Sequence, residues 1–427
     1  MRKKLIGIFV VGILIITGFA SIPTKAGPAL QPLTSPDPQI IDMIQQVNES
    51  LLYEYNTHLT SFGPRYTGTR NCRRAAEYIY TTFNEMGLDV EFQKWYHNGY
   101  FSKNVVATLP GTEVNSTAVY IFCAHYDTVA FSPGANDDGS GMAAVLATAK
   151  ILSQYSFPYT IRFIAFSGEE QAVYGSYCCA RDVSQRGDNI VAVINAEYIG
   201  YANTTEGGQT IRFFCLERSK WLGDFITTVN TVYRNQINMA VEIVPNSIYS
   251  DHQSFINNGF DAVMALNYDL DDAYHTRFDT SDRINWTYLT KGTKLLLAVV
   301  AELASTPLEL QVIITKPYHG YFYFLNLPLL RLNFDTDFLY SLSGIPVILG
   351  YAKLNVDVFP YDDIKYVLFC IDGNEQVWQY KSAPHYEWRI RTWDFSFIVG
   401  RHSIEVYAYT TSGIAAFDEI NIIIYQL

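Results

Sequence analysis

The chain has 427 residues, of which 49% are hydrophobic and 17% are charged, and its formal net charge is −12. This length is sufficient for two domains, and the composition is typical of globular rather than disordered proteins. The negative charge and the lack of a basic stripe argue against nucleic acid as a partner, because a phosphate backbone requires a cationic surface.

The N-terminus predicts export. Three basic residues, Arg2 to Lys4, precede an apolar stretch from Leu5 to Ala20, and residues 1–26 are therefore predicted to be a signal peptide or an N-terminal anchor. Cleavage after a small residue would release the protein, whereas retention would tether it, because the stretch is nearly long enough to span a bilayer. Either way we expect the body of the chain outside the cytoplasm, with membrane contact only through this segment.

The cysteines leave two interpretations open. There are six of them, and an exported protein is in a compartment where disulfides form. They show neither CxxC pairs nor zinc-ribbon spacing, so buried free thiols are an equally good interpretation.

The stretch from Pro23 to Pro38 is rich in Pro, Thr, Ser and Gly, and residues 27–40 are predicted to be a linker. Over residues 41–305 helical and strand-like patterns alternate, which predicts an α/β domain with a mixed, mainly parallel sheet and helices on both faces. Strands are predicted at 104–109, 119–123, 160–166, 190–195, 211–215 and 262–266. Helices are predicted at 41–55, 72–86, 141–155, 219–234, 251–257 and 286–304.

Residues 306–427 contain only short strand-like runs, separated by turn signals such as Asp372-Gly373-Asn374. This pattern predicts an all-β, immunoglobulin-like sandwich, and the segment resembles the modules of that kind appended to exported microbial enzymes. Trp378, Trp388 and Trp393 would either form an exposed binding patch or pack in the core of this domain.

Imidazoles and carboxylates follow the predicted strands of the α/β domain. In chain order they are His125 and Asp127 in AHYDT, Asp137 and Asp138 in GANDDGSG, Glu169 and Glu170 in FSGEE, Glu197 in INAEYIG, and His275 and Asp279 in YHTRFDT. In an open α/β sheet, ligands and catalytic groups collect at the carboxyl ends of the strands. Two His with several carboxylates are the ligands of a hydrolytic zinc site with one or two metals.

Each pattern also has a purely structural interpretation. His125 is either a metal ligand, with Asp127 holding its far ring nitrogen, or a core His satisfied by a neighbouring carboxylate. Asp138 suits a helix N-cap, which leaves Asp137 as the carboxylate that bridges two cations.

The other acidic residues are equally open to two interpretations. Glu169 and Glu170 point in different directions, so that one can bind metal while the other acts as a general base; alternatively, both lie in a surface turn. Glu197 ends an apolar run, where a carboxylate is costly unless it is paired or bound to metal. Asp251, in YSDHQSF, either orients the site or caps a helix.

Residues 41–305 resemble the co-catalytic zinc aminopeptidases of the bacterial leucyl aminopeptidase type, a superfamily that includes glutamate carboxypeptidase and the glutaminyl cyclases. The motifs AHYDT, GANDDGSG, SGEEQAVYGS, YSDHQSF and YHTRFDT stand in the order of that family, after FGPRYTGT and NVVATLPGT. One departure stands out, because Glu197 occupies a position where many aminopeptidases have Asp.

The resemblance implies two Zn2+ ions per chain and a role for each site residue. His125 and Glu197 would hold one zinc, Glu170 and His275 the other, and Asp137 would bridge them. Glu169 would be the base that deprotonates a water bridging the metals, Asp127 would orient His125, and Tyr274 would hydrogen-bond the oxyanion. The resemblance also implies a cis peptide after Asp137.

We therefore expect a secreted zinc-dependent exopeptidase that acts on peptides, most simply an aminopeptidase. Three alternatives stay open: a carboxypeptidase or dipeptidase, for which Arg277 is the candidate carboxylate-binding group; a single-zinc glutaminyl cyclase; and, in a different class, a catalytically silent surface-binding protein. The sequence leaves the oligomeric state open.

Overall fold

The computed structural model describes residues 29–30, 33–114, 116–246, 248–332, 345–359, 363–381, 383–391, 400–411 and 415–425. The chain forms two compact units, and the boundary between them lies between Gln311 and Val312. This is six residues beyond the predicted boundary at 305/306 and falls inside strand β10 (Leu308–Lys316). The predicted signal or anchor at 1–26 lies outside the described residues. Within the described ranges, no helix combines the length and the apolarity needed to cross a membrane.

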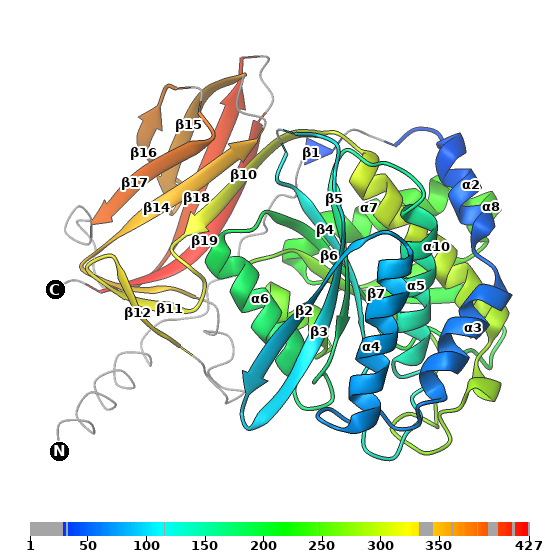
Figure 1. The fold of residues 1–427 in the computed structure, drawn as a ribbon. Coiled ribbons are helices and arrows are strands. Elements are labelled where there is room, and N and C mark those ends of the chain that lie inside the picture. The colour runs from blue at the N-terminus through cyan, green and yellow to red at the C-terminus, as the bar shows by residue number, and fades with distance from the viewer. Residues whose placement is uncertain are drawn as a thin grey trace, which may run out of the picture. The chain divides into compact units, whose positions relative to one another are not determined.

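The first unit is built on one eight-stranded sheet (Figure 1). Its spatial order is β2 (Asp89–His97), β3 (Tyr100–Leu109), β5 (Thr160–Phe166), β4 (Val119–His125), β6 (Ile190–Ala196), β9 (Ala262–Asn267), β7 (Thr210–Phe214) and β8 (Ala240–Val244). The four central strands, β5, β4, β6 and β9, run parallel. Strand β3 is antiparallel to both β2 and β5, and β7 is antiparallel to β9 but parallel to β8. The predicted mixed, mainly parallel α/β sheet is therefore confirmed.

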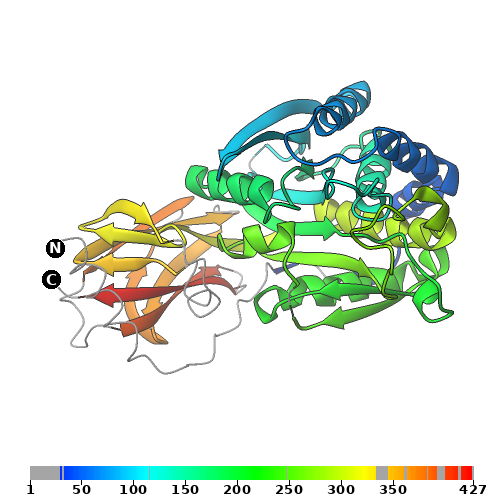
Figure 2. The same ribbon diagram turned by 90° about the horizontal axis from the view of Figure 1, so that it is seen from below.

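Helices cover both faces of this sheet (Figures 1 and 2). They are α2 (Pro38–Gln46), α3 (Glu49–Thr60), α4 (Arg70–Glu85), α5 (Gly139–Leu152), α6 (Tyr174–Arg186), α7 (Lys220–Val232), α8 (Arg234–Ile237), α9 (Asp251–Ile256) and α10 (Trp286–Ser305). Strand β4 shows why two faces are covered: Tyr120 and Phe122 pack with α4, α5 and α10, whereas Ile121 and Cys123 pack with α6 and α9. Because side chains alternate along a strand, a strand apolar at every position must be buried on both sides.

The six predicted strands of this unit are all present, and one predicted helix is wrong. The expected helix 41–55 is interrupted at Val47, because Asn48 is extended and its side chain caps α3 by accepting from the Leu51 amide. Strands β2 and β8 and helix α6 were not predicted from the sequence. Helix α6 has no side-chain cap and starts from Val173, which has a positive φ of 54°, so the usual start signal is lacking.

The residues expected to form a linker, 27–40, carry two elements. Strand β1 (Ala29–Leu30) pairs with the first residues of β10, and helix α2 starts at Pro38 behind an Asp37 cap. Proline at the first position of a helix costs no hydrogen bond, which explains why a Pro-rich segment still begins a helix.

The second unit is all-β, as predicted. One sheet contains β10, β14 (Tyr351–Phe359) and β17 (His385–Arg391). The other has the order β12 (Leu327–Arg331), β11 (Tyr321–Phe324), β13 (Val347–Leu349), β19 (Ala415–Tyr425), β18 (Gly400–Thr410), β15 (Ile364–Ile371) and β16 (Asn374–Gln379). The buried side chains of β14, Ala352, Leu354, Val356 and Val358, alternate with partly exposed ones, which is the pattern of a strand with one face in a core.

The structure shows which of the described tryptophans and cysteines are buried. Trp388 is half-buried against Phe369, whereas Trp378 is exposed and contacts Tyr366 and Tyr380. Trp393 lies outside the described residues. All six cysteines are buried free thiols, so the second of the two interpretations is confirmed.

Candidate metal centre

The ends of three adjacent parallel strands bring the predicted site residues together. His125 is the last residue of β4 and lies opposite Phe166, the last residue of β5. On the other side, Cys123 of β4 pairs with Asn195 of β6, so His125 and Glu197 each follow two residues beyond this pair. The chain passes from β4 to β5 on one side and returns to β6 on the other, which places the site at a topological switch point.

Asp137 joins two clusters of ligands. Its Oδ1 lies 3.2 Å from Nε2 of His125, and its Oδ2 lies 3.1 Å from Nε2 of His275. The same His125 nitrogen is 3.2 Å from Oε1 of Glu197, and that of His275 is 3.0 Å from Oε2 of Glu170. We call His125, Glu197 and Oδ1 of Asp137 the first half-site, and His275, Glu170 and Oδ2 of Asp137 the second half-site.

In the first half-site, Glu197 has one oxygen turned inward and one held from outside. Its Oε2 accepts from the Ser250 hydroxyl at 2.6 Å and from the Asn195 amide at 3.3 Å. Asn195 also donates to Ser250 at 3.0 Å. The extra methylene of Glu, compared with the Asp of many relatives, is thus accommodated by two polar neighbours, and Oε1 faces His125.

In the second half-site, Glu170 and His275 come from loops. Oε1 of Glu170 accepts from the backbone amide of Val129 at 3.0 Å, which leaves Oε2 for the imidazole. His275 has a positive φ of 56°, and its side chain is 38% exposed, while that of His125 is fully buried. The second half-site is therefore the more solvent-accessible of the two. Tyr274 stacks on the His275 ring with centroids 3.8 Å apart.

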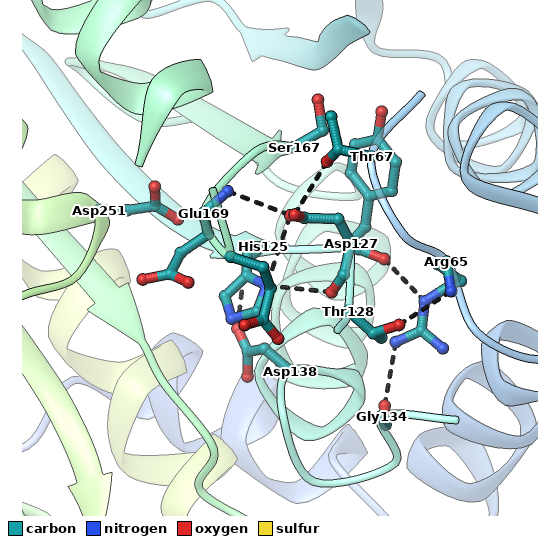
Figure 3. Close-up of polar contacts among 12 residues, drawn as sticks. Arg65, Thr67, His125, Asp127, Thr128, Gly134, Asp138, Ser167, Glu169 and Asp251 are labelled. Atoms are coloured by element: carbon teal, nitrogen blue, oxygen red, sulfur yellow. Dashed lines mark hydrogen bonds and ion pairs between the residues drawn. The ribbon is translucent and has the colours of Figure 1, made fainter. Parts of the chain in front are cut away.

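The outer nitrogen of His125 is held by Asp127, chiefly through its main chain. Nδ1 of His125 is 3.1 Å from the carbonyl oxygen of Asp127 and 3.6 Å from its carboxylate (Figure 3). The carboxylate accepts from the Thr67 hydroxyl at 2.9 Å and from the Glu169 amide at 3.3 Å. An Nδ1 that donates to an oxygen leaves Nε2 free to bind a metal. Asp127 thus links the orientation of His125 to the position of Glu169.

Asp138 lies close to the first half-site, and its carboxylate oxygens accept main-chain hydrogen bonds. One oxygen of Asp138, one of Glu197 and a ring nitrogen of His125 lie within 4.8 Å of one another. The Asp138 carboxylate accepts from the amides of His125, Gly141 and Tyr198 at 3.0–3.1 Å. It caps α5 by accepting from the Gly141 amide, the helix-cap interpretation of this residue. The peptide between Asp137 and Asp138 is cis, as the family resemblance implies.

Arg65 holds the loop between His125 and Asp137. It is fully buried, and its guanidinium donates to the carbonyl oxygens of Tyr126, Pro133 and Gly134 at 2.5–3.0 Å; the contact with Gly134 is drawn in Figure 3. Its own amide donates to the Thr128 hydroxyl at 2.9 Å. One cation therefore donates to three carbonyl groups, of which that of Gly134 also accepts from the Gly139 amide at 3.1 Å, in an interior where unpaired polar groups are costly.

The cluster holds more carboxylates than imidazoles, so bound cations would stabilise it electrostatically. Burial raises the pKa of Glu169 and of Glu170 above the usual range for Glu. Burial alone would lower the pKa of His275, but Asp137 and Glu170 outweigh it and raise this pKa to about 10. Burial raises the pKa of Asp137, yet hydrogen bonds and charge from both imidazoles lower it to about 2. The two ring nitrogens and the oxygens facing them match the N and O donors that Zn2+ takes in hydrolytic sites.

Comparison with known proteins agrees with this chemistry. Residues 104–300 match Peptidase family M28. Leucine aminopeptidase 1 of Coccidioides posadasii is 25% identical over 297 residues, covering 62% of this chain and 74% of that protein.

Two solved structures share the fold. LapB from Legionella pneumophila is 26% identical with a TM-score of 0.57, covering 65% of this chain and 78% of its own. A zinc aminopeptidase from Bacillus subtilis shares the fold alone, at 17% identity and a TM-score of 0.56, covering 61% of this chain and 96% of its own.

The fold, the two half-sites and these similarities define a zinc-dependent metallopeptidase, as expected. More particularly, the part of the first unit that carries both half-sites is similar, over residues 104–300, to Peptidase family M28.

Four residues of the site were not predicted from the sequence: Arg65, Thr67, Asn195 and Ser250. Arg65 and Thr67 lie in the motif FGPRYTGT, and Ser250 directly precedes Asp251. Asn195 stands two residues before Glu197, on the buried strand β6. A polar residue in an apolar strand next to a carboxylate is a signal that would have singled out Asn195.

Proposed function

We propose that the protein is an exported aminopeptidase that binds two zinc ions and removes N-terminal residues from peptides. The observation that carries this proposal is the position of Asp137, with one oxygen toward each imidazole. A short carboxylate that faces both half-sites is the ligand needed to bridge two cations. Bound in the half-sites, the cations would lower the pKa of a water and polarise the scissile carbonyl.

Glu169 is the residue placed to move protons. It follows β5, next to Glu170 of the second half-site, and its amide is tied to the Asp127 carboxylate. Burial raises its pKa, which brings a carboxyl group closer to the range where it can both take and return a proton near neutral pH. We assign to Glu169 the removal of a proton from the attacking water and its transfer to the leaving amine. Tyr274, stacked on His275, is the candidate donor to the oxyanion.

The charges of the site favour a substrate amine over a substrate carboxylate. The buried Arg65 is engaged with three carbonyl groups, and Arg283 pairs with Asp271 and Asp272. Arg277, the candidate for a carboxypeptidase, is exposed with its guanidinium over the Phe278 ring. A cationic N-terminal amine is therefore the better match for the surplus of carboxylates.

Metal content and a small substrate panel test the proposal. The panel contains free-amine aminoacyl substrates, N-blocked peptides and N-terminal glutaminyl peptides. Two zinc ions per chain, with turnover of free-amine substrates only, are expected. One zinc with cyclisation of glutaminyl peptides would instead indicate a cyclase, and release of C-terminal residues from N-blocked peptides would indicate a carboxypeptidase. Zinc without any turnover would indicate a binding protein.

Export is proposed from residues 1–26 alone, on the basis of their basic start and apolar stretch. Expression of the full chain in a secreting host, followed by N-terminal sequencing of the exported protein, tests it. A new N-terminus near Ala20 or Ala26 indicates a released enzyme. An intact N-terminus in the membrane fraction indicates an anchor, and protein retained in the cytoplasm would refute export.

A further inference from the structure

Asp279 gathers three consecutive amide groups of the loop that carries the bridging ligand. Its carboxylate accepts from the amide of Asn136 at 2.7 Å and from that of Asp137 at 3.0 Å. Its main-chain oxygen accepts from the amide of Ala135 at 3.2 Å. Asp279 is 1% exposed, so these contacts are made away from solvent, where hydrogen bonds to a charged acceptor are strong.

The contacts of Asp279 also connect two loops that are distant in sequence. It lies four residues after His275, in the same loop, and its own amide is bonded to the carbonyl of Thr276. Asp279 thus ties the loop of His275 to the loop of Asp137. These are the two loops whose side chains meet in the second half-site, where Nε2 of His275 lies 3.1 Å from Oδ2 of Asp137.

The two half-sites differ in how much they depend on this tie. His125 ends β4 and Glu197 follows β6, so hydrogen bonds of the sheet fix the backbone of two of the three residues of the first half-site. His275 comes from a loop, at a positive φ. Side chains at both half-sites have outer hydrogen-bond partners, but residues on loops also need contacts that hold their backbone in place.

We propose that Asp279 is a positioning residue that sets the second half-site and thereby the binding of one of two zinc ions. The inference rests on the proposed two-zinc function. It predicts that loss of the Asp279 carboxylate weakens zinc binding in the second half-site by roughly 10–100-fold, the usual effect of removing a residue that orients metal ligands. Zinc binding in the first half-site should change little.

The chain offers a matched control in Asp269. Its carboxylate is also nearly buried and also accepts from two consecutive amides, those of Asn203 and Thr204, both at 2.8 Å. The two amides lie six and seven residues after Glu197. Both reach Oδ2 of Asp269, whereas its Oδ1 accepts from the Thr204 hydroxyl at 2.8 Å. Asp279→Ala and Asp269→Ala therefore each remove a buried carboxylate that accepts from two consecutive amides. A purely structural role predicts similar effects for the two variants.

The experiment is a calorimetric titration of the zinc-free full chain with Zn2+, together with its thermal unfolding. Wild type should bind two ions, His125→Ala should weaken one event, and His275→Ala the other. Asp279→Ala should reproduce the pattern of His275→Ala, while Asp269→Ala should bind both ions like wild type at a comparable loss of thermal midpoint. Two wild-type-like events in Asp279→Ala, equal weakening of both events, or weakening in Asp269→Ala would each overturn the inference. A wild type that binds fewer than two ions would instead refute the proposed function.

Discussion

Ser250 donates its hydroxyl proton to Oε2 of Glu197 over 2.6 Å, while it accepts from the amide of Asp251 and from the side chain of Asn195. The hydroxyl thus donates one hydrogen bond and accepts two, which fixes the direction of its O–H bond toward Glu197. The arrangement shows how a Glu takes the place that many relatives give to an Asp: the longer side chain reaches Ser250 with one oxygen and faces His125 with the other.

Glu197→Asp should therefore weaken zinc binding in the first half-site. A side chain one methylene shorter cannot keep both the Ser250 contact and the position near His125. We expect a loss of roughly 10-fold or more in the affinity for one zinc, measured by titration of the zinc-free chain. Ser250→Ala should act in the same direction, and Ser254→Ala, on the same helix, is the control. Wild-type affinity in Glu197→Asp would contradict this account.

Glu169→Gln should abolish turnover and leave zinc binding and folding intact. The amide keeps the shape of the side chain but cannot take a proton, so kcat should fall by roughly 100- to 10,000-fold. Steady-state kinetics on a free-amine substrate, combined with metal analysis of the same sample, measures this. A variant that loses zinc together with activity would show that Glu169 is needed for the site itself.

Removal of metal should lower the stability of the first unit. Ligands that bind only the folded state add about 4 kcal/mol when present at 1,000 times their dissociation constant. We expect the thermal midpoint of the wild type to fall when zinc is removed with a chelator and to recover when zinc is restored. Asp137→Ala, which lacks the bridging carboxylate, should show little response to either treatment. An equal response in this variant would mean that zinc binds elsewhere.

Arg65→Leu should destabilise the first unit by about 3 kcal/mol, because it removes three charge-assisted hydrogen bonds to carbonyl groups in the interior, and the Gly139 amide remains as a donor to that of Gly134 alone. Urea denaturation followed by circular dichroism measures the loss. Arg73→Leu is the control, since the Arg73 side chain is exposed and donates to a single carbonyl, that of Gly68. Similar losses in the two variants would argue against a special role for the Arg65 contacts.

A partly exposed ion-pair cluster away from the metal centre predicts a pH effect on stability. Burial raises the pKa of Asp188, but hydrogen bonds from Arg186 and Arg162 outweigh it and lower the pKa below the usual value. A carboxyl group whose folded-state pKa is lowered stabilises the fold above its unfolded pKa of about 3.9 and loses this contribution as the pH falls through the folded value. Asp188→Asn should cost about 1 kcal/mol at neutral pH.

This cost should shrink as the pH falls below about 4. Unfolding of the zinc-free wild type and variant at several pH values tests the sign. A difference that grows in acid would contradict it.

Much of the site could be predicted because its residues follow apolar strands. Runs such as Val119–Cys123 and Thr160–Phe166 can only be buried strands, and polar residues that follow such strands meet at one edge of the sheet. The order of the motifs around His125, Asp137 and Glu170 along the chain supported the same prediction. The break between α2 and α3 was missed because the apolar spacing continues through it, and only the cap at Asn48 marks the new start.

What the sequence by itself determined are the fold class, the apolar strands and the chemistry of the ligands, since these depend on local composition and periodicity. The tertiary structure alone decided which oxygen of Glu197 faces His125, that Asp127 holds that ring mainly through its carbonyl, and that Asp279 joins two ligand loops. These facts depend on contacts between residues far apart in the chain. Hydrogen bonds are short-ranged and directional, so their partners are fixed only once the whole unit has packed.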